Sequence, residues 1–179
     1  MPDQLAGTQP VINVGYVRTM ARYNSWQNDQ LMPVLLDMPT AELTMDRGAF
    51  FGSILGTANY LLCGDMLWLS RFDPSVQPPF EAFDKWPKFH KDARAWAADR
   101  HRIDGKIRHW AEALRELDLL GDLQCVPASG GKACTVPRGI AVIQLFNHQT
   151  HHRGQIHAMV TAAGQEAPVS DIVYMPETT

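Results

Sequence analysis

The residues best suited to chemistry form a histidine-rich run near the carboxyl end of the chain. Four of the seven histidines lie between Leu145 and His157. The surrounding segment, residues 140–163, has helical periodicity and contains no proline. Residues four apart lie on the same face of a helix, so His148 and His152 are expected to point the same way. Two imidazole nitrogens presented together can bind one metal ion.

This spacing leaves two interpretations open. A pair of histidines needs further ligands from elsewhere to make a zinc-type site, and the H-E-x-x-H protease motif is absent because Gln149 replaces its glutamate. Gln155 falls on the same stripe as the pair, whereas His151 and His157 point elsewhere. The other interpretation is a polar helix face whose histidines line the interior of a helical protein.

Length and composition favour one domain over residues 1–179 and exclude some functions. The formal net charge is −3 and there is no basic run, which argues against a nucleic-acid partner. No apolar run is long enough to span a membrane. Residues 1–10 are expected to be a loose tail and lack the pattern of a secretory signal, so a cytoplasmic location is expected.

Helical periodicity predicts an all-α fold of four long helices with a small β-hairpin before the last one. The predicted helices span residues 12–38, 49–71, 88–117 and 137–164, and the hairpin pairs residues 123–126 with 133–136. Asn13 is a candidate helix cap, Pro33 predicts a kink or break, and Gly164 predicts the last helix end. The proline-rich segment 73–87 is predicted to be a loop without a regular element. The tail 168–179 is expected to be extended, with residues 172–175 on the surface.

Charged residues inside the predicted helices suggest further contacts. Asp65 interrupts an apolar stripe, so a buried hydrogen bond or ion pair with Arg22 or Arg153 is expected in preference to metal binding. The many charges of residues 88–117 are interpreted as a solvated face. Three histidines are expected at its surface or boundary: His90, His101 and His109.

Three cysteines argue against a disulfide framework. Cys63 is expected to be a small buried core residue. Cys125 and Cys134 flank the hairpin turn and could face each other, either as free thiols, which a reducing compartment favours, or as a disulfide.

Three stretches resemble the DinB/YfiT-like family of metalloenzymes, and the resemblance covers nearly the whole chain. They are residues 20–28, residues 51–62 continued by Asp65 and by Trp68 and Leu69, and residues 147–155. The resemblance implies a four-helix bundle, commonly a homodimer, with a divalent metal ion held by three histidines. His148 and His152 match two of those ligands.

The position of the third ligand is occupied by Tyr60. A neutral phenol is a poor ligand, so three roles stay open: Tyr60 could ligate the metal, donate a hydrogen bond to metal-bound water, or fill the space of the absent histidine. The small neighbours Thr57 and Gly64 leave its ring room to reach the next helix. Asn59 and Gln155 are the candidates for supporting the ligands.

The resemblance implies a metal-dependent enzyme, either a thiol-dependent transferase or a hydrolase. Its cofactor would be zinc, nickel, iron or manganese, and its partner a small-molecule substrate or thiol. The alternative is a non-catalytic, metal-depleted bundle that acts as a stress-related small-molecule binder, which the replacement by Tyr60 favours. DNA repair is a third, weaker idea, and the acidic charge balance argues against it.

Overall fold

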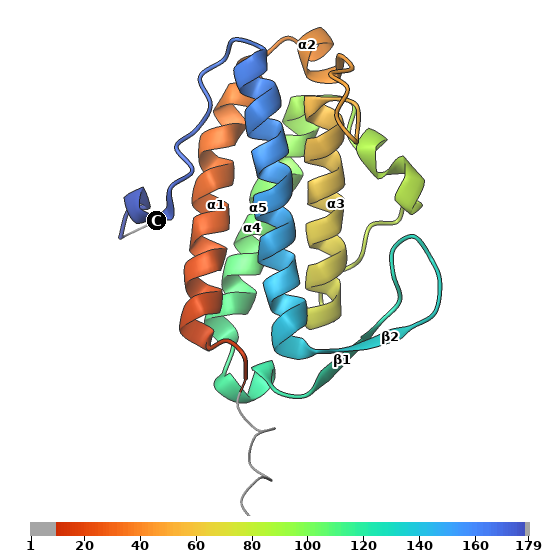
Figure 1. Cartoon of the computed structure of the whole chain (residues 1–179), viewed down its shortest axis with the longest axis vertical. Coiled ribbons are helices and arrows are strands. Elements are labelled where there is room, and N and C mark those ends of the chain that lie inside the picture. The colour runs from red at the N-terminus through yellow and green to blue at the C-terminus, as the bar shows by residue number, and fades with distance from the viewer. Residues whose placement is uncertain (1–9, 178–179) are drawn as a thin grey trace, which may run out of the picture.

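The computed structural model describes residues 10–177 and is mostly helical, with a small two-stranded hairpin. Its four long helices lie alongside one another (Figure 1): α1 (Val14–Asp37), α3 (Ile54–Phe72), α4 (Ala93–Ala113) and α5 (Arg138–Ala162). α1 packs against α4, and α3 packs against α5. α1 and α5 run in one direction and α3 and α4 in the other, so the chain between α3 and α4 crosses the length of the molecule.

Short polar residues define where these helices begin. The Asn13 side chain accepts a hydrogen bond from the Tyr16 backbone N–H, which confirms it as the cap of α1. Ser53 caps α3 and Asp92 caps α4 in the same way. Gly164, with φ of 77°, follows the end of α5 as predicted, since a residue at this position commonly adopts the left-handed conformation. Pro33 does not break α1, which continues to Asp37.

Three predicted boundaries are wrong. α3 begins at Ile54, because Ala49 and Gly52 form an isolated bridge and Ser53 then caps the helix. α4 spans only Ala93–Ala113, because a 3₁₀ helix precedes it (η1, Phe83–Lys88) and another follows it (η2, Glu116–Leu119). η1 also corrects the expectation that residues 73–87 contain no regular element. The buried Trp86 anchors η1, and its indole N–H donates to the Glu81 carbonyl.

The predicted hairpin is confirmed. β1 (Asp122–Cys125) pairs antiparallel with β2 (Cys134–Pro137), and Cys125 lies directly opposite Cys134. Pro137 ends β2 and directly precedes α5. A short helix, α2 (Thr40–Thr44), lies between α1 and α3, and a 3₁₀ turn, η3 (Ile172–Tyr174), lies in the C-terminal tail.

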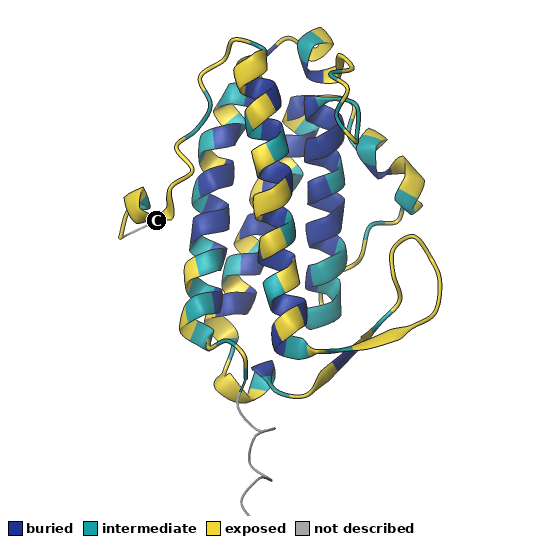
Figure 2. Cartoon of the chain, in the orientation of Figure 1, coloured by how far each residue is buried: buried dark blue, intermediate teal, exposed yellow. Residues whose placement is uncertain are grey.

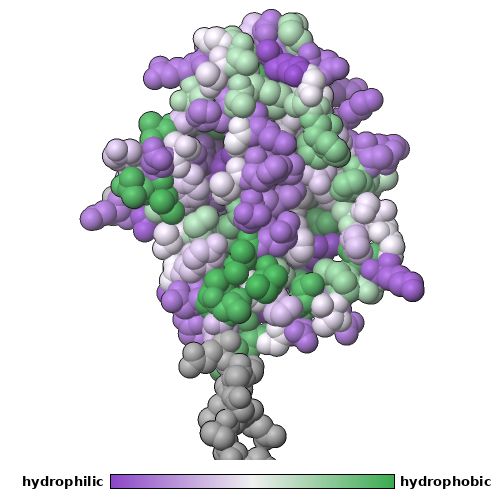
Figure 3. Space-filling model, in the orientation of Figure 1, coloured by the Kyte–Doolittle hydropathy of each residue, from purple (hydrophilic) through white to green (hydrophobic). Residues whose placement is uncertain are grey.

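The core lies between the four long helices, and α3 is buried along most of its length (Figure 2). In the face seen in Figure 3, hydrophilic side chains gather over the middle of α5, and a hydrophobic patch lies among hydrophilic groups at the left edge, beside α1. Ile172, Val173 and Tyr174 of the C-terminal tail are exposed, as expected. The loose tail predicted over residues 1–10 lies outside the described residues, except for Pro10. Within residues 10–177, no helix is long and apolar enough to cross a membrane.

Candidate functional site

His148 and His152 lie side by side on α5, facing α3. Their rings meet edge to face with centroids 4.4 Å apart. His152 is buried and His148 is half-buried. The four-residue spacing therefore does place both imidazoles at one point of the interior. We call these two residues the histidine pair.

The His148 ring is packed closely against the backbone of α3. A Cβ atom added to Gly64 would lie 2.8 Å from His148 Cε1, so the ring occupies space that only a glycine leaves open. The Nδ1 atom of His148 is buried and has no hydrogen-bond partner among the described residues. Burial, helped by the neighbouring imidazoles of His152 and His151, lowers the pKa of His148 to about 4. The ring is therefore neutral at physiological pH, the form that binds metals.

His152 is oriented by the next turn of its own helix. Its Nδ1 lies 2.7 Å from Gln155 Oε1, so Nδ1–H donates this hydrogen bond and Nε2 keeps its lone pair. Burial lowers the pKa of His152, while the Gln155 contact opposes that shift. The structure thus places Gln155 where a residue supporting a ligand would stand.

Tyr60 comes from α3 and lies against both imidazoles. Its ring centroid is 5.6 Å from that of His148 and 5.1 Å from that of His152. On its other side it stacks on Phe51, with centroids 3.7 Å apart. Burial raises the pKa of the phenol, which is therefore neutral at physiological pH. The sequence located this residue beside the histidines, and its chemical role stays a prediction.

Asn59 is directed elsewhere. Its amide N–H groups donate to the carbonyls of Pro87 and His90, and its oxygen accepts from the His90 backbone N–H. These bonds fasten the chain between η1 and α4 to α3. The structure does not bring Asn59 to the histidine pair, and its observed contacts are structural.

A cavity of about 350 Å³ opens beside His148 and Tyr60, and we call it the histidine cavity. Its walls come from α3, η1, the hairpin and α5, and they include Gly64, Trp68, Arg71, Phe83, Trp86, Cys125, Cys134 and Gln144. The aromatic residues Phe80, Phe83 and Trp86 predict from the sequence that segment 73–87 packs back onto the helices, and Trp86 is indeed buried. The sequence did not predict that η1 and the hairpin line a cavity beside His148.

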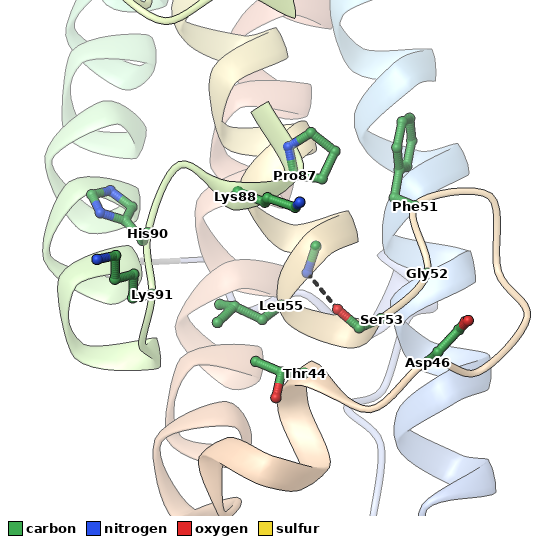
Figure 4. Close-up of a pocket in the computed structure, with 11 residues that line it drawn as sticks. Thr44, Asp46, Phe51, Gly52, Ser53, Leu55, Pro87, Lys88, His90 and Lys91 are labelled. Atoms are coloured by element: carbon green, nitrogen blue, oxygen red, sulfur yellow. Dashed lines mark hydrogen bonds between the residues drawn. The ribbon is translucent and has the colours of Figure 1, made fainter. Parts of the chain in front are cut away.

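A larger cavity, of about 580 Å³, lies between the turn before α3 and the connection into α4 (Figure 4). Lys88, His90 and Lys91 stand on one side of it, and Phe51 and Asp46 on the other. It contains neither member of the histidine pair. We therefore regard the smaller cavity, which the imidazole of His148 and the phenol of Tyr60 both line, as the candidate site.

Asp65 has a different partner from the two expected. Arg100 on α4 donates to Asp65 at 2.6 Å, while Arg22 donates to carbonyls of the C-terminal tail and Arg153 to Asn24. Arg100 also pairs with Asp104, and all three of these charged side chains are buried. The interpretation of the α4 charges as a solvated face is wrong for Arg100 and Asp104, because periodicity alone does not show which charges share a buried partner. The three histidines of residues 88–117 lie at the surface or its boundary, as expected: His101 and His109 are exposed and His90 is partly buried.

Among residues 10–177, no group of three or more His, Cys, Asp or Glu side chains is arranged to hold a metal ion, so the pair has no third ligand of these types. Comparison with the curated proteins finds no match. The profile of the DinB family matches residues 1–179, the entire sequence. The chain therefore belongs to the DinB family.

Proposed function

We propose that this protein is a metal-dependent enzyme built on a DinB-type four-helix bundle, with a divalent transition metal held by His148 and His152. The carrying observation is the pair of neighbouring imidazoles, one of which has a buried Nδ1 atom without a hydrogen-bond partner in the described part of the chain. Burying such an atom is unfavourable unless a ligand or water satisfies it. Zinc, nickel, iron and manganese all accept imidazole nitrogen.

The residues around the pair suit a metal that keeps open positions. Gln155 fixes the tautomer of His152 and leaves Nε2 free to bind. The Tyr60 phenol is neutral and close to both rings, so we assign it to donating a hydrogen bond to a bound reactant or to filling space. A bound divalent ion would supply Lewis acidity, which lowers the pKa of a thiol or of water towards neutrality.

The histidine cavity would hold the substrate, a small molecule or a thiol. Phe83, Trp86 and Trp68 give it apolar walls that exclude water, while Arg71 contributes a positive charge. The Arg71 guanidinium lies 4.4 Å from the Trp68 ring centroid and donates to the Val126 carbonyl, so its position is fixed. This combination suits a thiol-dependent transferase or a hydrolase acting on a small anionic substrate.

A second candidate is a non-catalytic bundle that binds a small molecule without metal, in a stress-related role. Tyr60 favours it, because a neutral phenol, stacked on Phe51, stands where the family resemblance implies a third histidine ligand. Two imidazoles alone bind transition metals weakly.

Metal analysis of protein purified without a histidine tag separates the two candidates. The enzyme proposal expects about one metal ion per chain after supplementation with zinc, nickel, iron or manganese, and its loss in His148→Ala. His101→Ala is the matched control, since His101 is exposed on α4 and should leave the metal content unchanged. Absence of all four metals from the wild type would overturn the enzyme proposal in favour of the binder.

The homodimer implied by the family also stays a proposal. Sedimentation of the untagged protein over a range of concentrations tests it, and a monomer at every concentration would contradict it.

A further inference from the structure

Two cysteines face each other across the hairpin. Cys125 of β1 is directly opposite Cys134 of β2, and their sulfur atoms are 3.4 Å apart. Opposed residues in antiparallel strands have Cα atoms about 4.5–5.5 Å apart. A disulfide spans Cα separations of about 4.4–6.8 Å. The two thiols can therefore be joined with little movement of the backbone.

The pair is accessible and is also part of the histidine cavity. Cys134 is exposed and Cys125 partly exposed, and both line the same cavity as His148 and Tyr60. Arg71 of α3 holds the hairpin in this position by donating to Val126, next to Cys125. A molecule entering the cavity thus meets both thiols.

Cys63 provides a contrast within the same chain. It is fully buried on α3, and burial together with nearby carboxylates raises its pKa to about 12. Because the thiolate is the reactive form, Cys63 is expected to be inert in the folded protein. Thiol chemistry in the native protein should be confined to the hairpin.

We propose that Cys125 and Cys134 form a redox-active pair in the wall of the histidine cavity, which a low-molecular-weight disulfide oxidises to a cross-strand disulfide. The proposal goes beyond the proposed function and does not depend on metal binding. It assigns a reversible modification site to the hairpin.

The reaction balances as two thiol–disulfide exchanges. The thiolate of the more exposed Cys134 attacks one sulfur of the small disulfide, which forms a mixed disulfide and releases one small thiol. The Cys125 thiolate then attacks the Cys134 sulfur, so the protein disulfide forms and a second small thiol leaves. The protein loses two protons and two electrons, and the small disulfide gains them. Excess small thiol reverses both steps.

Oxidation would also alter the cavity wall. The bond would close residues 126–133 into a covalent loop, and Pro127, Ala128 and Ser129 of this loop line the cavity. Gly130 and Gly131 have positive φ angles at its turn, a conformation that other residues rarely adopt. The oxidised hairpin would have fewer conformations available than the reduced one, which restricts how the wall can move.

The test is incubation of the untagged, folded protein with mixtures of oxidised and reduced glutathione, followed by intact-mass analysis and thiol counting. We expect the wild type to lose two thiols and the mass of two hydrogen atoms, and to recover both with dithiothreitol. Cys63→Ser should behave in the same way. Cys125→Ser should stop at a glutathione adduct on Cys134, because the resolving thiol is absent.

Trypsin locates the bond, because Lys132 lies within the loop that it would close. Oxidised protein cut after Lys132 should keep its two fragments joined until it is reduced. Unchanged thiols under oxidising mixtures, glutathione adducts without an internal bond, or reaction at Cys63 would each overturn the proposal. His148→Ala should oxidise like the wild type, so that failure of the metal site is distinguishable from failure of the cysteine pair.

Discussion

The His148 ring can lie where it does because Gly64 has no Cβ atom. Imidazole and glycine backbone are in contact across the interface of α3 and α5, and no other residue type leaves room for the ring. Gly64 is therefore part of the candidate site, although it has no functional group. The backbone of α3 at this glycine thus determines where the His148 ring can lie.

Gly64→Ala is expected to impair metal binding more than stability. The new methyl group would push aside the His148 ring, which is the movable end of a side chain, so the unfolding free energy should change by less than about 2 kcal/mol. Displacement of a ligand by a fraction of an ångström should weaken metal affinity about tenfold or more.

Gly105→Ala on α4 is the matched control for Gly64→Ala. No atom lies within 4 Å of its added Cβ, so the substitution should stabilise the protein by about 0.5–1 kcal/mol through helix propensity. Isothermal titration with zinc and thermal unfolding measure both effects. Equal metal affinity in the two variants would contradict the assigned role of Gly64.

Tyr60→His is expected to tighten metal binding, because it restores a third imidazole beside the pair. We expect an increase in affinity of about tenfold or more, since even residues behind the ligands change affinity by about 10–100-fold. Competition against a chelating dye measures it. Tyr60→Phe is the control and should leave affinity within a few-fold, whereas a large loss would show that the phenol ligates.

The contact between α3 and α4 depends on buried charges. Arg100 donates to Asp65 on α3 and to Asp104 on its own helix, and Asn24 and Asn28 of α1 donate to Asp104. These bonds join α1, α3 and α4. Burial raises the pKa of Asp104 to about 6, against the opposing effect of Arg100.

Arg100→Met is expected to lower the free energy of unfolding by about 3–5 kcal/mol, because it leaves two buried carboxylates without their cation. Arg102→Met is the control on the same helix. The Arg102 pair with Asp99 is exposed, so its loss should change stability by no more than about 1 kcal/mol. Urea unfolding measures the unfolding free energy of both variants. Similar losses in the two would show that the buried ion pairs do not stabilise the contact between α3 and α4.

The whole fold should respond to acid partly through His148. In metal-free protein, folding lowers the pKa of His148 from 6.5 to about 4. Between these two pH values His148 is therefore protonated in the unfolded chain and neutral in the folded chain. The stability that depends on neutral His148 should therefore be fully present above pH 6.5 and be lost as the pH falls from 6.5 to 4. At about 1.4 kcal/mol per pH unit the loss has an upper limit of about 3 kcal/mol.

His148→Asn removes this titration and is compared with the wild type, both in the presence of a chelator. The difference in unfolding free energy between the two proteins should shrink as the pH falls through this window. A constant difference from pH 7 to pH 4 would contradict the depressed pKa, since the other titrating groups are common to both.

Periodicity and capping residues were enough to predict the helical class, the hairpin and the pairing of His148 with His152. These are local properties, because hydrogen bonding and side-chain direction within one helix or turn depend on neighbours in sequence. The approximate ends of α1 and α5 followed for the same reason, with Asn13 and Gly164 as their signals.

Only the tertiary structure decided which distant residues share a partner. Three contacts join residues far apart in sequence: the pairing of Asp65 with Arg100, the hydrogen bonds of Asn59 to Pro87 and His90, and the contribution of the cysteine hairpin to the histidine cavity. Such contacts depend on how the helices cross and which space they leave, which local spacing does not encode. The position of Tyr60 against the pair also depends on α3 packing on α5, but here the family resemblance had already indicated the contact.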